Sequence, residues 1–430
     1  MTGEPLTGRV GYLVAVFPHS TQTFVLFEVA ELERLGLRVE VHPLRARPGD
    51  GTVHPEAADL VRRAHYARLL SPRTLAAQAA WLAERPGAYL GAWWRALAGH
   101  ARSPRGLALA LAVVPVAARA ARELRRAGAT HVHAHWATHG ALAAFVVHRL
   151  TGLPYSFTTH AHDLYVDRAM LERKTREASF VVTISDFNRR LLGRLYGEWA
   201  AAKTSVIRCG VDLSVFAPRP HPSGGPLTVS CVAGLREKKG QRYLIEACGM
   251  LAAEGLDIRC LLVGDGECRA ELEALVAERG LGDRIEFLGR CSRAEVREAL
   301  GRSHAMALPS VTTADGDMEG IPVALMEAMA SEVPVVASAL SGIPELVEDG
   351  RTGLLVPERD PRALAAAIRR VHDDPGGARE RAAAGRERVL EAYDLRRNAR
   401  ALAELLTWRY RPPAGAAAPP APAPTVASQA

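Results

Sequence analysis

The most informative stretch of the chain runs from Gly316 to Met329 and reads GDMEGIPVALMEAM. Two glutamates, Glu319 and Glu327, lie eight positions apart on either side of a Gly-Ile-Pro junction, and helix-forming residues follow the proline. Proline suits the first position of a helix, because the N–H that it lacks would have no intrahelical partner there. The sequence therefore predicts a helix with Pro322 at its first position.

The start of this helix is suited to an anion such as a diphosphate, because first-turn N–H groups are unpaired and the helix dipole favours negative charge. Gly320 can adopt backbone angles that bring the chain close to a ligand. Glu327 lies about 7.5 Å further along the axis, at about 1.5 Å per residue, where a carboxylate can accept ribose hydroxyls. Glu319 precedes the helix and can meet polar groups on the far side of the phosphate. The alternative is an ordinary amphipathic helix with two solvated carboxylates.

The order of the predicted elements indicates the fold. Val10–Phe17 is a continuous run of β-forming residues, as expected of a strand buried on both faces of a parallel sheet. Phe24–Gly36 has helical periodicity and ends at glycine, and Leu37–His42 is the next strand. Leu227–Val232 opens a second series of alternating strands and helices. The chain is therefore predicted to be an α/β protein with two Rossmann-like halves.

Two lysines follow the strand at Leu227–Val232. The chain has only four lysines, and Lys238 and Lys239 are neighbours. In a chain that otherwise uses arginine, this choice favours a compact point charge, as for a phosphate. A solvated turn is the alternative for Lys238. Gly264-Asp265-Gly266 lacks the third glycine of a dinucleotide fingerprint, which disfavours an NAD oxidoreductase.

Histidines follow or occupy two predicted strands. His160 lies just past the strand Tyr155–Thr159, at the edge where open α/β sheets bind ligands, and a neutral imidazole there can donate to or accept from a sugar or phosphate. The alternative is a loop histidine beside a helix-capping Asp163. Three further histidines share one face of a strand, but no carboxylate or cysteine lies nearby in the sequence, so no metal is predicted. These are His131, His133 and His135.

Composition limits the class of protein. The 430 residues suffice for two domains, and 48% hydrophobic with 23% charged residues is typical of a globular protein. Six cysteines without a CxxC pair indicate reduced, buried thiols of the cytosol. The longest uncharged apolar run, Leu107–Ala118, is too short to span a bilayer. No basic segment followed by an apolar core is found at the start, so no signal peptide is predicted and a cytoplasmic location is expected.

The net charge of +7 is concentrated in one region. The segment between Val61 and Thr130 contains twelve arginines and two glutamates, a net charge of +10. This concentration of charge favours a local anionic partner, but it gives no reason to expect nucleic acid. This segment belongs to an Ala/Leu/Arg-rich helical region, Pro55–Arg126, that contains three tryptophans and is interrupted at four prolines, Pro72, Pro86, Pro104 and Pro115. Arginine and tryptophan on amphipathic helices suit a membrane interface. A solvated helical subdomain with a tryptophan core is the equal alternative.

The block Ser310–Glu345, with its Glu-x7-Glu spacing and the later Ser-Gly-Ile-Pro-Glu, resembles the donor-site signature of glycosyltransferase family 4. The loop Phe17–Phe24 resembles that of exopolysaccharide members, notably those of the colanic-acid type. The resemblance covers about residues 9–410. It implies retaining enzymes of the GT-B fold, in which two Rossmann-like domains face each other across a cleft and a C-terminal helix crosses back to the first domain.

The family pattern implies a division of the chain. The expected parts are an acceptor-side domain at 1–217 with the basic helical region 55–126, a linker at 218–225, a nucleotide-sugar-binding domain at 226–385, a crossing helix at 386–411 and a disordered Ala/Pro tail at 412–430.

The family pattern also implies site residues. His160 would lie against the donor sugar, with Lys239 and Glu319 as the other catalytic groups. The expected donor-binding residues are Arg236, Gly320, Ile321, Pro322, Val323, Glu327, Arg290, Ser20 and Thr21. Ser20 and Thr21 stand where many members carry two glycines. The family pattern places an arginine directly after a glycine, near the position that Gly234 holds here, and Arg236 lies two residues later.

The expected activity is transfer of a sugar, with retention, from a nucleotide diphosphate sugar to a glycan or lipid-linked acceptor in polysaccharide or glycoconjugate biosynthesis. No metal or cofactor is expected, and region 61–130 would contact the inner face of the cell membrane. Two alternatives stay open: another GT-B enzyme acting on nucleotide sugars, such as an epimerase or phosphorylase, or a non-catalytic lipid- or glycan-binding protein.

Overall fold

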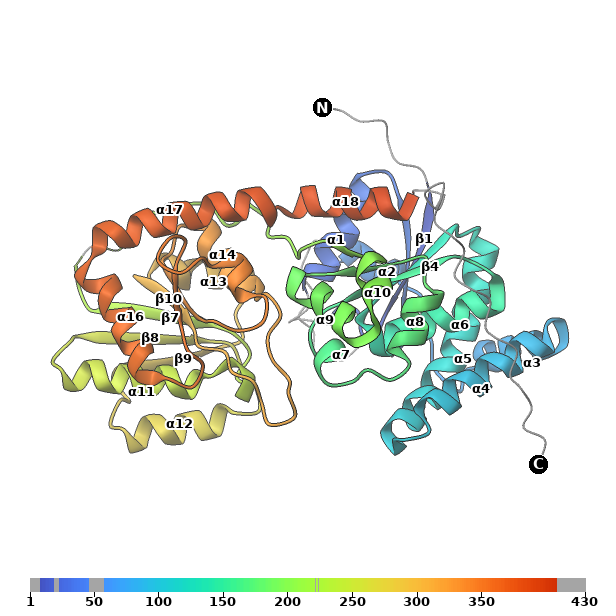
Figure 1. Cartoon of the computed structure of the whole chain (residues 1–430), viewed down its shortest axis with the longest axis horizontal. Helices are drawn as coiled ribbons and strands as arrows, with labels where there is room; N and C mark the ends of the chain where they lie inside the picture. Colours follow the sequence, from blue (N-terminus) through green and yellow to red (C-terminus); the bar gives the residue numbers. More distant parts are fainter. Residues whose placement is uncertain (1–7, 19–22, 46–57, 221, 223, 408–430) are drawn as a thin grey trace.

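The computed structural model describes residues 8–18, 23–45, 58–220, 222 and 224–407. Two parallel six-stranded sheets form the centres of two lobes (Figure 1). The strand order is β2-β1-β3-β4-β5-β6 in the first sheet and β12-β11-β10-β7-β8-β9 in the second. The predicted pair of Rossmann-like domains is confirmed. Each sheet has a switch point, between β1 and β3 and between β7 and β10, where neighbouring connections leave in opposite directions.

The strands of the first sheet are β1 (Arg9–Val14), β2 (Arg38–Pro43), β3 (His131–His135), β4 (Tyr155–Thr159), β5 (Phe180–Thr183) and β6 (Thr204–Val206). Those of the second are β7 (Leu227–Val232), β8 (Ile258–Val263), β9 (Ile285–Gly289), β10 (Ala305–Leu308), β11 (Val335–Ser338) and β12 (Leu354–Val356). Most of these side chains are buried, because helices cover both faces of each sheet.

The helices of the first half are α1 (Thr23–Arg34), α2 (Ala58–Arg63), α3 (Pro72–Glu84), α4 (Pro86–His100), α5 (Pro104–Ala127), the π-helix η2 (Trp136–Gly140), α6 (Ala141–Thr151), α7 (His162–Tyr165), α8 (Leu171–Glu177), α9 (Asp186–Tyr196) and α10 (Glu198–Ala202). Those of the second are the 3-10 turn η3 (Glu237–Lys239), α11 (Gln241–Ala253), α12 (Arg269–Glu278), α13 (Arg293–Gly301), α14 (Val323–Ala330), α15 (Ile343–Leu346), α16 (Pro361–Asp373), α17 (Pro375–Ala392) and α18 (Leu395–Thr407).

The prolines of the basic helical region have two different effects. Pro72, Pro86 and Pro104 each begin a new helix, so the predicted interruptions at these three residues are confirmed. The expected interruption at Pro115 is wrong, because this residue lies inside α5. Pro115 cannot donate to the carbonyl of Leu111, so α5 lacks one backbone hydrogen bond at this turn.

The expected crossing helix 386–411 is instead two helices. α17 and α18 meet at Tyr393-Asp394, and residues 408–411 lie outside the described part. At this junction the amide of Val211 donates to the Tyr393 carbonyl (2.8 Å), and the Asp394 carboxylate accepts from the amide of Arg397 (2.8 Å). The backbone leaves the helix here to pair with the segment that joins the two lobes. α18 then packs on α1, so the predicted return to the first domain is confirmed (Figure 1).

The cysteines are less uniformly buried than predicted. All six are free thiols, of which Cys231, Cys248 and Cys260 are buried, while the other three are half-buried. Among the described residues, no helix combines the length and the hydrophobicity that crossing a bilayer requires.

Candidate functional site

The loops that follow β7 and β10 meet at the switch point of the second sheet, where open α/β folds place their ligands. η3 follows β7 and carries both lysines, and the segment after β10 carries Glu319. A Cβ atom on Gly240 would lie 1.9 Å from the carbonyl oxygen of Pro309. Only glycine therefore lets these two loops pack together.

The two lysines and two carboxylates form a compact ionic cluster. Lys239 Nζ lies 2.8 Å from Glu319 Oε2, and Lys238 Nζ lies 3.0 Å from Asp317 Oδ2 and 3.7 Å from Glu319 Oε1. Burial alone raises the pKa of Glu319, which is only 8% exposed, but the two lysines outweigh it and hold this pKa below its ordinary value. Glu319 is therefore an ionised carboxylate that neutralises lysines in the absence of another anion.

The approach to α14 differs in two details from the prediction. α14 begins at Val323, and Pro322 is the residue before it, with ψ of 126° outside the helical range. Gly320 does not have a positive φ. A Cβ atom there would instead lie 2.7 Å from Ile184 Cδ1 and 3.7 Å from the carbonyl oxygen of His160. Glycine is needed at this position because the loop presses against the first domain, not because of its backbone angles.

His160 stands at the carboxyl end of β4, and its ring lies among aromatic rings. Its centroid is 4.9 Å from that of Trp136 and 5.1 Å from that of Phe24. Both backbone groups of His160 are hydrogen-bonded. Its amide donates to Asp163 (3.0 Å), and its carbonyl accepts from Asn188 Nδ2 (2.6 Å). Burial, together with the neighbouring His135, lowers the pKa of His160 well below its ordinary value, so the ring is neutral. Asp163 therefore holds this loop, alongside any role of His160.

Direct contacts join the two domains beside this site. His162 Nδ1 lies 3.7 Å from Asp317 Oδ2, and the Tyr165 hydroxyl lies 2.9 Å from Ser341 Oγ. Glu345 accepts hydrogen bonds from the first two amides of α9, those of Asp186 (2.9 Å) and Phe187 (2.6 Å). The Ser-Gly-Ile-Pro-Glu segment thus caps a helix of the opposite domain. The sequence gives no signal of this contact, because the partners are 159 and 158 positions apart.

Glu327 lies on α14 and is half-buried. Burial raises its pKa to about 7, and Arg293 opposes the rise. The Arg293 guanidinium lies 4.2 Å from the centroid of the Phe27 ring and 3.9 Å from an oxygen of Asp212. Arg293, on α13, is a neighbour of Glu327 that the sequence analysis missed.

The remaining predicted donor residues are placed as follows. Ile321 is buried beside Gly320, and Arg236 is exposed at the start of η3. Arg290 Nε lies 3.9 Å from Asp265 Oδ2, which joins the loops after β8 and β9. Ser20 and Thr21 lie outside the described residues. The structure thus brings Lys239, Glu319 and Gly320 together, with Gly320 beside the His160 backbone.

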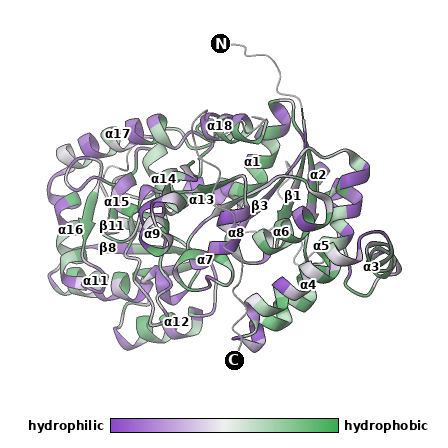
Figure 2. Ribbon diagram, turned by 45° about the vertical axis from the view of Figure 1, so that its right-hand side comes forward, coloured by the Kyte–Doolittle hydropathy of each residue, from purple (hydrophilic) through white to green (hydrophobic). Residues whose placement is uncertain are grey.

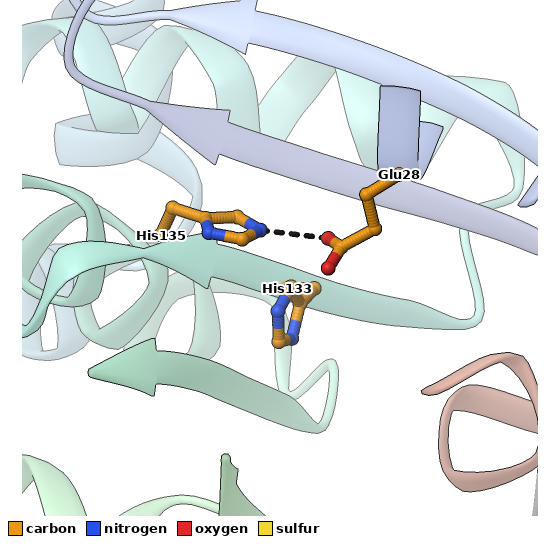
Figure 3. Close-up of side chains that lie close together, drawn as sticks. All are labelled: Glu28, His133 and His135. Atoms are coloured by element: carbon orange, nitrogen blue, oxygen red, sulfur yellow. Dashed lines mark hydrogen bonds and ion pairs between the residues drawn. The ribbon is translucent and has the colours of Figure 1, made fainter. Parts of the chain in front are cut away.

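Two groups of histidines and carboxylates in the described part have ligand atoms within 4.8 Å of one another. The first is Glu28, His133 and His135 (Figure 3), so a carboxylate distant in sequence does reach the histidine-rich strand. His133 already contacts hydroxyls through both nitrogens, with Ser156 at 2.8 Å and Thr158 at 3.0 Å. These contacts account for His133 without a metal ion.

The second group is His42, His65 and Glu123. The two histidine rings are stacked, with centroids 4.5 Å apart and planes at 10°. A ring nitrogen binds a metal along its lone pair, which lies in the plane of the ring, so two stacked rings do not aim at one ion. Burial is the main reason that the pKa of His42 falls to about 3. We assign no metal to either group.

Comparison with known families covers nearly the whole chain. Residues 21–215 match the model of Glycosyltransferase Family 4, and residues 217–388 match that of Glycosyl transferases group 1. A Salmonella typhimurium protein named for colanic acid biosynthesis, the glycosyltransferase WcaL, is 34% identical over 93% of this chain and 99% of its own length. The amylovoran biosynthesis glycosyltransferase AmsK of Erwinia amylovora is 39% identical over 48% of this chain and 51% of its own length.

Solved structures share the architecture. HepE of Anabaena, in complex with UDP, superposes with a TM-score of 0.66 at 18% identity and covers 93% of this chain and 99% of its own. Sucrose-phosphate synthase of Thermosynechococcus elongatus gives a TM-score of 0.69 at 22% identity and covers 92% of this chain and 98% of its own. At these identities the likeness concerns the fold.

Proposed function

The chain belongs to glycosyltransferase family 4, and on this premise we propose that it transfers a hexose from a nucleotide diphosphate sugar to a glycan or lipid-linked acceptor in polysaccharide biosynthesis. The observation that carries the proposal is the ion pair of Lys239 with Glu319 at the switch point of the second sheet. It lies next to the start of α14, and Gly320 brings that loop against the backbone of His160. The names of the matched relatives, which refer to colanic acid and amylovoran, support a polysaccharide product.

The proposed chemistry uses charges that are already in place. A bound diphosphate would attract Lys239 away from Glu319, and the first-turn amides of α14 would add dipoles of the right sign. Arg236, exposed on the same loop, is proposed as an additional cation for the diphosphate. Because Glu319 is held by two lysines, we do not assign it as a nucleophile. The acceptor oxygen would bond to the anomeric carbon on the face that the phosphate leaves, and its proton would pass to the departing phosphate oxygen. This route retains the anomeric configuration.

The donor screen tests the proposal at its first step. A ligand that binds only the native state raises the apparent unfolding temperature. We expect one of UDP-glucose, UDP-galactose, GDP-mannose and GDP-fucose to raise it more than the others, and Lys239→Ala to reduce the shift without abolishing it. Product analysis with that labelled donor, with and without acceptor, separates transfer from epimerisation and phosphorolysis. If no nucleotide sugar binds while anionic lipid or glycan does, the protein is a non-catalytic binder.

Replacing Glu327 by glutamine is expected to raise the donor KM about tenfold or more at pH 8, because hydrogen bonds to a charged acceptor contribute about 1.5–3 kcal/mol. With a pKa of about 7, the wild-type carboxyl gains a proton as the pH falls, so its donor KM should rise below pH 7 and approach that of the variant. Measurements of KM between pH 5.5 and 8.5 check this. Glu332→Gln, two residues past the end of the same helix and paired with Arg386, is the control.

The difference in stability between wild type and Glu327→Gln should change with pH in a defined direction. Between pH 4.5 and about 7, the folded state keeps a proton on Glu327 that the unfolded state has lost. The contribution of Glu327 to the free energy of unfolding therefore falls as the pH rises through this range. Relative to Glu327→Gln, the wild type should therefore be less stable at pH 8 than at pH 5. A pH-independent difference in Tm between the two proteins would contradict this.

We also propose that the enzyme acts at the inner face of the cell membrane, through α3, α4 and the start of α5. All large hydrophobic side chains that the described part exposes fall between residues 69 and 111: Leu69, Leu70, Leu75, Leu82, Leu90, Trp94 and Leu111. These helices project from the first domain, and α4 is coloured largely hydrophobic (Figures 1 and 2). Trp81 is instead fully buried under Arg122 and Arg125, as a tryptophan core requires. Exposed apolar side chains beside arginines suit an anionic lipid surface.

The double variant Leu70→Ser, Trp94→Ser is expected to bind phosphatidylglycerol vesicles about tenfold or more weakly than wild type, because both side chains, 80% and 73% exposed, would lose apolar burial in the bilayer. Vesicle sedimentation measures the affinity, and activity on a water-soluble acceptor should not change. Phosphatidylcholine vesicles and the conservative Leu70→Met, Trp94→Phe pair are the controls. Equal binding by the serine variant and wild type would exclude this surface.

A further inference from the structure

A chain of hydrogen bonds links helix α1 to the ring of His160. Glu28 Oε1, on α1, lies 2.8 Å from His135 Nε2, at the end of β3 (Figure 3). The other nitrogen of that ring, His135 Nδ1, lies 3.0 Å from His160 Nε2. The Tyr12 hydroxyl donates to the same oxygen of Glu28. Both rings are buried: His135 is 1% exposed and His160 is 7% exposed.

The partners determine which nitrogens carry hydrogen. A carboxylate oxygen only accepts, so His135 Nε2 must hold the proton that it donates to Glu28. A neutral imidazole has one N–H, and His135 Nδ1 is then left with a lone pair. Across the 3.0 Å contact, His160 Nε2 must therefore donate to His135 Nδ1. In neutral His160 the remaining nitrogen, Nδ1, carries a lone pair and no proton.

We infer that Glu28 and His135 are positioning residues that set the tautomer of His160, so that His160 Nδ1 accepts a hydrogen bond from a ligand hydroxyl and cannot donate one. The ligand part rests on the proposed function, because that function places a sugar against His160. The sequence left open whether this imidazole donates or accepts, and the relay from α1 decides between the two.

The opposite arrangement of protons is unfavourable at both ends of the relay. If His135 carried its proton on Nδ1, the lone pair of Nε2 would face Glu28 Oε1 at 2.8 Å, and two acceptors would be buried against each other. The Tyr12 hydroxyl, 3.4 Å from His135 Nε2, does not relieve this contact, since it already donates to Glu28. The other rings around the pair are Phe24, Trp136 and His133. None of these rings brings a charge.

The tautomers can be measured without any substrate. In protein labelled with ¹⁵N-histidine, long-range ¹H–¹⁵N correlations distinguish Nδ1–H, Nε2–H and doubly protonated rings, and His135→Gln and His160→Gln assign the two signals. We expect both rings in the Nε2–H form at pH 8. An Nδ1–H tautomer of His160, or a doubly protonated His135, would overturn the inference.

Glu28→Leu tests the direction of the relay. Without the carboxylate, the Tyr12 hydroxyl becomes the donor nearest to His135 Nε2 at 3.4 Å, so both rings should change to the Nδ1–H form. Glu28→Gln keeps the shape of the side chain and should give a mixture, which preserves the test if the leucine variant does not fold. Glu33→Gln, on the same helix and paired with Arg63, is the matched control and should leave both tautomers unchanged. Unchanged tautomers in both Glu28 variants would refute the role of Glu28.

Kinetics then connect the tautomer to the reaction. With whichever of UDP-glucose or GDP-mannose supports transfer, Glu28→Leu should lower kcat about ten- to hundredfold, as expected when a buried hydrogen bond is replaced by two facing donors. The donor KM should change less than threefold. If the tautomers behave as expected but kcat does not change, the relay exists and His160 does not contact the sugar. The NMR experiments therefore test the tautomers independently of the proposed function.

Discussion

Lys239→Ala is expected to lower kcat about 10²–10³-fold, because removing one preorganised donor from a charge that develops in the transition state has an effect of this size. Lys239 is suited to that role by its position at the end of η3, 2.8 Å from Glu319 and beside the start of α14. Single-turnover measurements with saturating donor give the rate of the chemical step. Lys203→Ala, in the first domain, is the control for a general effect of losing a lysine.

The same substitution also leaves Glu319 with one lysine fewer, so stability must be separated from catalysis. In the wild type the pKa of Glu319 is lowered, and its ionisation stabilises the fold above its ordinary pKa, a contribution lost as the pH falls through the lowered value. Without Lys239, burial should raise that pKa and reduce stability at neutral pH. The double variant Lys239→Ala, Glu319→Gln should recover Tm but not kcat. A single variant with kcat within threefold of wild type would remove Lys239 from the site.

His160→Ala is expected to lower kcat about 10²-fold while the donor KM changes little. The ring is neutral and held between Trp136 and Phe24, so it is rigidly placed and contributes most where the geometry of the transition state differs from that of bound donor. Steady-state kinetics over a range of donor concentrations separate the two constants. His148→Ala, on α6 of the same domain, is the control. A large rise in KM with unchanged kcat would instead assign His160 to ground-state binding.

Local patterns in the sequence were sufficient for the fold. Runs such as Val10–Phe17 and Leu227–Val232 are apolar and β-forming, and a strand buried on both faces needs little more to be recognised. Predictions failed where a distant segment changes a local rule. Pro115 stays inside α5, which packs against α3, α4 and α6, and the predicted long C-terminal helix is divided where its backbone pairs with Val211.

For the site, the sequence supplied residue types whose spacing has a chemical meaning, and it supplied them one segment at a time. The family resemblance grouped Glu319, Lys239 and His160, and their roles stay predictions. The sequence could not indicate Glu28, which lies 107 positions from His135, or Arg293 beside Glu327. Such pairs leave no periodic trace, since nothing in the local backbone depends on the distant partner.

The sequence by itself determined the two parallel sheets, their helices and the family, because these follow from hydrophobic period, turn residues and motif spacing. Only the tertiary structure decided which groups share charge and protons. Glu319 is held ionised by lysines from another loop, and Glu345 caps a helix of the other domain. Glu28 acts on the ring of His160 through the hydrogen bonds of His135. The reason is physical: protonation and hydrogen bonding depend on distances of a few ångströms, which chain order does not specify.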